Sequence, residues 1–229
     1  MPSIILNKPI FDVDFFITGF HGIGLVGYLA VRHLVTTMPC ERIGFMGVAM
    51  PYTSYMKGIL SSPGDIYNCP GNGITVALFN YGIPDRQLFS ASRELAKWVI
   101  ASGFKNVVLF GGLDVSLRDP RDELGVKVIS TRRDVAENLL NDNYLVLGPL
   151  AIMMNEFASK SYPAMAILPY ANPSLADPRA AATGLSYFSS KFNVKLDLAK
   201  LYEDAQALEE EIQKQMKQME GRKDTSLYI

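Results

Sequence analysis

The spacing that most directly suggests chemistry belongs to three glycines near the N-terminus. Gly22, Gly24 and Gly27 form a Gly-x-Gly-x-x-Gly pattern in "GFHGIGLVG", after an apolar run and before a segment of helical period, which is the context of a dinucleotide-binding turn. Such a fold also needs an acidic residue at the end of the next strand, and "RIGFMGVAMPY" ends at Tyr52 without one. The pattern therefore favours a tight turn that brings a helix close to the sheet, with a residual anion site as the alternative.

Histidines could bind a metal or act as bases, and the chain has only two. His21 lies in the glycine turn and His33 lies twelve residues later, and neither has a cysteine or acid at metal-ligand spacing. Both are predicted to be structural or surface residues. We expect no metal and no cofactor.

A charged loop, Gly111–Glu123, follows an apolar strand-like run, where α/β folds usually place their sites. Its polar side chains are Asp114, Ser116, Arg118, Asp119, Arg121, Asp122 and Glu123. Charges in loops are more often simply solvated, and no credible base and nucleophile pair accompanies them. The sequence therefore predicts no catalytic residue, and an anion or ligand site in this loop stays open.

The last three residues, Leu227, Tyr228 and Ile229, are apolar, although chain ends usually fray and are polar. The preceding "MEGRKD", from Met219 to Asp224, carries four charges and a glycine. We expect a solvated tether there, with an apolar triplet that suits another molecule better than this chain's own core.

The amino-acid composition limits the classes of binding partner that we expect. The 229 residues carry 22 Lys and Arg against 23 Asp and Glu, a net charge of -1, which gives no electrostatic footprint for nucleic acid or an anionic membrane. No basic leader and no spanning apolar run are present. Cys40 and Cys69 match no metal motif, so we expect free thiols in a reducing cytoplasm.

The elements that must position these residues alternate between strand-like and helix-like segments. Short, largely unalternating apolar runs predict strands buried on both faces: 14–18, 42–49, 74–81, 106–110, 144–148 and 163–168. Helical periodicity predicts helices: 23–37, 86–102, 132–141, 150–162 and 178–191, the last capped by Asp177 with Pro178 in the first position. A turn-rich stretch, 61–73, indicates an antiparallel excursion. Together they predict a three-layer α/β/α sandwich with a mostly parallel or mixed sheet.

A final amphipathic helix is predicted over residues 197–220. Its apolar positions follow a 3-4-3-4 spacing on a background of Glu, Gln and Lys: Leu198, Leu201, Ala205, Leu208, Ile212 and Met219. This stripe needs a partner, which is either the surface of the same domain or the same helix of another copy.

Several segments together resemble a known family. These are "GFHGIGLVG", "LFNYGIPDRQLFSASRELAKWVIASGFKNVVLFGGL", "LGPLAIMMNE" and "ANPSLADPRAAATGL" with its leucine-rich final helix. They resemble the proteasome assembly chaperone 2 family in its archaeal form, over nearly the whole chain. The resemblance implies a fold similar to purine nucleoside phosphorylases and a homo-oligomer. It divides the chain into a chaperone-family domain at 1–196, the helix at 197–220 and a flexible docking tail at 221–229.

The resemblance also implies a function for the tail. Leu227, Tyr228 and Ile229 match the hydrophobic-tyrosine-any motif with which proteasome activators and assembly factors dock between α subunits of the 20S core. We therefore expect a non-enzymatic, ATP-independent assembly chaperone or activator, since the chain has no P-loop. The alternative is a phosphorylase-like or hydrolase enzyme that uses the glycine turn and the charged loop, with Arg86 or Arg93 as an anion binder.

Overall fold

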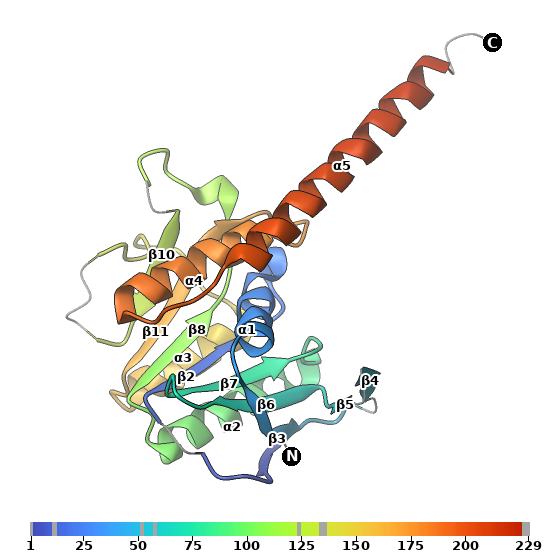
Figure 1. Ribbon diagram of the computed structural model, residues 1–229. Helices are drawn as coiled ribbons and strands as arrows, with labels where there is room; N and C mark the ends of the chain where they lie inside the picture. The colour runs from blue at the N-terminus through green and yellow to red at the C-terminus, as the bar shows by residue number, and fades with distance from the viewer. Residues whose placement is uncertain are drawn as a thin grey trace.

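The computed structural model describes residues 2–10, 13–50, 53–56, 59–122, 125–132 and 137–225, with side chains as far as residue 212. Over these residues the chain forms a mixed nine-stranded sheet between two helical layers (Figure 1). Its strands are β1 (Ser3–Leu6), β2 (Phe15–Gly19), β3 (Glu41–Gly47), β6 (Gly64–Cys69), β7 (Ile74–Phe79), β8 (Asn106–Phe110), β9 (Leu113–Asp114), β10 (Val126–Ser130) and β11 (Ala164–Ala171). A separate pair, β4 (Ser54–Met56) and β5 (Ile59–Ser61), stands apart from it.

The sheet runs in the order β1-β3-β6-β7-β2-β8-β11-β10, with β9 beside β11. Strands β7, β2, β8 and β11 are mutually parallel, whereas β1, β3, β6 and β10 pair antiparallel to their neighbours. The predicted mixed sheet and the antiparallel excursion are therefore confirmed.

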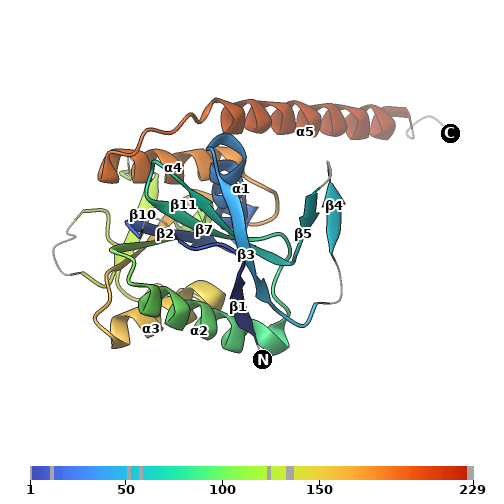
Figure 2. The ribbon, with the colours of Figure 1, turned by 60° about the horizontal axis from the view of Figure 1, so that its bottom comes forward.

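The helices divide between the two faces of the sheet. They are α1 (Val26–Thr37) after the short η1 (Ile23–Leu25), α2 (Asp85–Ser102), η2 (Val115–Leu117), α3 (Gly148–Ser159), α4 (Pro178–Phe192) and α5 (Ala199–Thr225). Helices α1 and α4 pack on one face with α5 outside them, and α2 and α3 cover the other (Figure 2). The predicted three-layer α/β/α sandwich with a C-terminal helix is confirmed.

Neighbouring side chains along β2 point to opposite faces of the sheet, so this strand contributes to the core under both helical layers. Phe16 packs in the core under α2 and α3, and Ile17 packs in the core under α1 and α4, and both side chains are fully buried. A strand that is apolar on both faces is stable only when both are covered. This is why the short apolar runs predicted the parallel strands correctly.

Two predicted elements are wrong. Residues 144–147 are an irregular segment and Gly148 already begins α3, so no strand forms at 144–148. In the predicted helix at 132–141, residue 132 and residues 137–141 are not helical, and residues 133–136 lie outside the described part of the chain. Strand β10, just before that segment, was not predicted.

The prediction of two free thiols is also wrong. Cys40 precedes β3 and Cys69 ends β6, and these strands pair antiparallel with Glu41 opposite Asn68. This register places the two cysteines side by side, and they form a disulfide with a Cα–Cα distance of 4.0 Å. Their separation of 29 residues along the chain gave no indication of this contact.

Candidate functional site

The glycine turn joins β2 to α1 and is built for close packing. A Cβ on Gly27 would lie 2.5 Å from the Phe110 carbonyl oxygen and 2.6 Å from the Phe20 nitrogen, so α1 begins in contact with the ends of β2 and β8. Gly24 has a φ of +62°, and a Cβ there would meet the Ala171 Cβ at 2.7 Å. The predicted close approach of helix and sheet is confirmed.

The two histidines have different surroundings. The Nε2 of His33 on α1 lies 2.7 Å from the Asp197 carbonyl oxygen, a hydrogen bond that ties the segment before α5 to the body. His21 stacks on Tyr28 with ring centroids 4.5 Å apart, and burial lowers the pKa of its imidazole. Within the described part of the chain, no group of three or more His, Cys, Asp or Glu side chains could hold a metal ion.

The charged loop after β8 pairs many of its charges internally. The Asp114 carboxylate accepts a hydrogen bond from the Ser116 backbone N–H at 2.9 Å and so caps η2. Asp119 forms a two-point ion pair with Arg121, whose hydrogen bonds hold the pKa of the Asp119 carboxyl well below its usual range. Each contact stabilises the loop itself.

Asp122 connects this loop to the sheet. Its carboxylate accepts hydrogen bonds from the Lys127 ammonium at 2.7 Å and from the Tyr170 hydroxyl at 2.8 Å. The Lys127 bond, followed by the Tyr170 bond, lowers the pKa of Asp122, while burial and then Asp122 raise the pKa of Tyr170 to about 12. Glu123, the last residue of the predicted grouping, lies outside the described residues.

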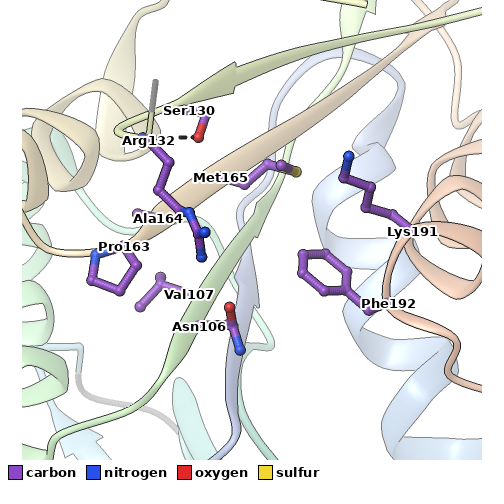
Figure 3. A pocket seen from close by; sticks show the side chains of 9 residues that line it. All are labelled: Asn106, Val107, Ser130, Arg132, Pro163, Ala164, Met165, Lys191 and Phe192. Atoms are coloured by element: carbon purple, nitrogen blue, oxygen red, sulfur yellow. Dashed lines mark hydrogen bonds between the residues drawn. The ribbon is translucent and has the colours of Figure 1, made fainter. Parts of the chain in front are cut away.

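One small pocket lies at the amino ends of β8 and β11 (Figure 3). The glycine turn lies at the other end of the parallel strands, after β2. Arg132 extends past Met165 toward Asn106. The Phe192 ring, at the end of α4, lies on the opposite side of the pocket from Arg132. The volume of about 170 Å³ is below the range of most ligand sites. Its position is also at the wrong edge of the parallel strands for an α/β site.

A larger cavity lies at the carboxyl ends of β2 and β8, and sequence reasoning missed it. It has a volume of about 410 Å³ and lies between the glycine turn, the start of the charged loop and residues 145–150. The order of the strands in the sheet, which the sequence does not show, accounts for the cavity: β2 and β8 are neighbours, and α1, after β2, and α3, after β8 and β10, pack on opposite faces. That arrangement creates a crevice at the carboxyl end.

The C-terminal helix is the other feature that stands out. Leu201 and Ala205 of α5 are buried on the body, and Arg179 of α4 holds Glu209 at 2.9 Å. Beyond this anchor α5 leaves the body and runs outward to residue 225 (Figures 1 and 2). The first half of the predicted stripe therefore packs on its own domain.

Only the first part of the expected tail, residues 221–225, lies within the described residues. Helix α5 continues through Gly221 to Thr225, a stretch that the sequence placed in a flexible tail. The predicted docking residues Leu227, Tyr228 and Ile229 lie outside the described residues. The division of the chain at 196 and 220 stays a prediction.

A comparison with protein families identifies the chain's relatives. The model of the PAC2 family matches residues 16–216. The chain belongs to the PAC2 family. This range contains the glycine turn, the charged loop, the cavity and the anchored half of α5, and it stops before the docking residues. A search of curated proteins found no match.

Solved structures share the fold of this PAC2 protein. Pyrococcus furiosus PbaA, described as an archaeal homologue of proteasome-assembly chaperone, matches with a TM-score of 0.81 and 20% identity, over 99% of this chain and 100% of PbaA. Pyrococcus furiosus PbaB, described as an archaeal proteasome activator, matches with a TM-score of 0.76 and 18% identity, over 93% and 98% of the two chains. A Mycobacterium tuberculosis proteasome-assembly chaperone homologue matches with a TM-score of 0.67 and 18% identity, over 87% and 94%.

The described part of this PAC2 chain contains no helix that is both long and apolar enough to cross a membrane.

Proposed function

We propose that this PAC2 protein binds the 20S proteasome core as an ATP-independent assembly chaperone or activator, and is not an enzyme. The observation that carries the proposal is family membership together with the likeness, over nearly the full length of each chain, to PbaA and PbaB. The docking residues are Leu227, Tyr228 and Ile229, which follow in the sequence soon after the projecting helix α5 ends at Thr225.

The geometry of α5 supports this role. At a rise of about 1.5 Å per residue, the part beyond Glu209 extends roughly 24 Å from its anchor on α4. An arm of that length would hold the last residues clear of the domain, so the tail could enter a pocket on a large partner without a clash between the two bodies. The His33 bond to the Asp197 carbonyl and the buried Leu201 set the direction of this arm.

The chemistry of the tail suits a pocket between two protein subunits. The Ile229 carboxylate would pair with a lysine, the Tyr228 ring would fill an apolar slot while its hydroxyl finds a polar partner, and Leu227 would add buried area. One such tail binds weakly. A homo-oligomer that presents several tails would raise the avidity by about 10²- to 10⁴-fold, and for this reason oligomerisation belongs to the proposal. We also propose a cytoplasmic location, although the Cys40–Cys69 disulfide means that free thiols no longer support it.

The experiment is a binding measurement with purified 20S core immobilised on a sensor surface. Tyr228→Ala should abolish measurable binding and leave the melting temperature and oligomeric state unchanged. Tyr228→Phe should be milder, because the hydroxyl contributes one hydrogen bond of about 0.5–1.5 kcal/mol and the ring most of the buried area. Tyr55→Ala is the matched control, since Tyr55 on β4 is 72% exposed and lies far from the tail in the sequence.

A second measurement separates the two roles. An activator should accelerate peptide hydrolysis by the mature core, whereas an assembly chaperone should accelerate formation of the core from its α subunits and leave mature activity unchanged. Docking through the tail is wrong if Tyr228→Ala binds the core as well as wild type does.

A further inference from the structure

The cavity at the carboxyl ends of β2 and β8 has a place in the fold that the proposed function does not use. The chain leaves β2 through the glycine turn into α1 on one face, and the helix that follows β8 and β10, α3, lies on the other. Open α/β sheets bind their ligands where the chain diverges in this way. The volume of about 410 Å³ lies within the usual range for small-molecule sites.

Most of the cavity wall is apolar. Its buried side chains include two aromatic rings and three leucines: Phe20, Phe110, Leu113, Leu150 and Leu168. Rings of this kind offer flat faces for stacking and bury large apolar areas. The wall therefore suits a flat, apolar occupant.

Only two ionisable side chains line the cavity within the described residues, His21 and Asp114. No lysine or arginine among these residues faces it, and the Asp114 carboxylate is already bonded to the Ser116 N–H. A phosphate or carboxylate ligand would enter without a cation to pair with and close to an acid, which is costly in an apolar site. A neutral ligand is favoured.

His21 supplies the polar contact. Its Nδ1 is sealed from solvent and has no hydrogen-bond partner in the described part of the chain. A buried N–H without a partner is rarer than a bare acceptor, so the proton belongs on Nε2, and burial keeps the ring neutral by lowering its pKa. His21 lines the cavity, so Nε2 is the ring nitrogen that would donate a hydrogen bond to an oxygen or nitrogen of a ligand there.

Leu145 and Leu147 mark the rim of the cavity. Their side chains are 84% and 78% exposed although they belong to its lining. Exposed leucines beside an apolar cavity gain burial when a ligand fills it. An aromatic ring in the cavity would give both side chains a surface to pack on.

We propose that this cavity is a binding site for a small, flat, neutral aromatic molecule that accepts a hydrogen bond from His21. None of the residues that line this cavity belongs to the docking tail. A failure of the proteasome-binding experiment would therefore leave this proposal unaffected.

The test uses 2-naphthol, which is flat, aromatic and neutral at pH 7, and titrates the full-length protein by fluorescence. We expect a Kd below about 1 mM, which a ligand of this size reaches in a well-formed apolar site. The comparison probe is 2-naphthyl phosphate, which has the same ring system and a charged group. It should bind at least tenfold more weakly. Equal binding of the two probes would contradict the assignment of a neutral ligand.

Gly22→Leu is the blocking variant. Gly22 lines the cavity in an extended conformation with φ −158° and ψ −152°, and a Cβ there meets nothing within 4 Å. We expect the new side chain to occupy part of the cavity without moving the backbone, so 2-naphthol binding should be lost. Gly82→Leu is the matched control, because Gly82 also has open space at Cβ and does not line the cavity. It should bind 2-naphthol as wild type does.

His21→Phe tests the hydrogen bond without filling the cavity. Phenylalanine keeps a flat ring beside Tyr28 but has no donor, so 2-naphthol should bind about 3- to 10-fold more weakly. This variant also keeps the test decisive if Gly22→Leu fails to fold. The proposal is overturned if 2-naphthol does not bind wild type, if folded Gly22→Leu binds it unchanged, or if His21→Phe has no effect.

Discussion

The packing of the glycine turn makes a quantitative prediction for Gly27→Ala. Gly27 is in the first turn of α1, and a Cβ there would lie 2.5 to 2.8 Å from three backbone atoms, the Phe110 oxygen and the nitrogen and oxygen of Phe20. None of these is the end of a flexible side chain that can rotate away. The helix must therefore move by roughly 0.9 Å from the sheet to reach ordinary van der Waals separation.

The cost of this movement follows from the packing around it. Overpacking a well-packed core costs about 1–3 kcal/mol, and contact with three backbone atoms places Gly27→Ala at the upper end. Alanine regains about 1 kcal/mol because it is a better helix former than glycine. We expect a net loss near 2 kcal/mol in the free energy of unfolding. For a chain of this length that lowers the melting temperature by about 4–8 °C.

The assay is thermal unfolding followed by circular dichroism, with urea unfolding as a second measure and protein concentration held fixed. Gly22→Ala is the internal control, because its Cβ meets nothing within 4 Å, and it should stay within about 0.5 kcal/mol of wild type. If Gly27→Ala were as stable as wild type, or if Gly22→Ala lost as much, then close helix–sheet packing would not explain the glycine pattern.

Titrating NAD to sub-millimolar concentration should not raise the melting temperature, because the glycines allow the helix to pack closely on the sheet and do not bind a cofactor. A rise of several degrees would instead support a dinucleotide-binding site at this turn. The protein should elute well above its monomer mass of 25.3 kDa, and a clean monomer by light scattering at micromolar concentration would contradict the predicted homo-oligomer. Because folding raises the pKa of Tyr170 from 10.0 to about 12, the folded state keeps its proton longer, so this contribution to stability is complete below pH 10 and lost between pH 10 and 12. Tyr170→Phe should flatten that alkaline decline in urea unfolding, and an unchanged pH profile would show that Tyr170 does not cause it.

Local signals in the sequence were sufficient where one element decides its own structure. Strand β8 has the predicted bounds 106–110 because an apolar run of that length is stable only in a doubly covered sheet. Helix α4 begins at the predicted Pro178 because the Asp177 carboxylate accepts a hydrogen bond from the Ala180 N–H at 2.8 Å.

Contacts made outside the element itself decided the features that the sequence did not reveal. Strand β10 carries Lys127 as its second residue, which looks unlike a buried strand, yet this residue is only 9% exposed because its ammonium pairs with the Asp122 carboxylate in the preceding loop. The disulfide between Cys40 and Cys69 depends on the pairing of β3 with β6. The pairing of β3 with β6 has no local signature, because register between strands is set by the assembled sheet.

The failed strand at 144–148 is the most informative of these differences. An apolar run of that length predicts burial, but Leu145 and Leu147 are the most exposed of the large apolar side chains in the described chain. Conflicts between local pattern and final structure are expected at functional sites, where a sequence serves something other than its own core. Here the conflict lies at the rim of the cavity between β2 and β8. The apolar run is thus accounted for if its leucines pack against a bound molecule.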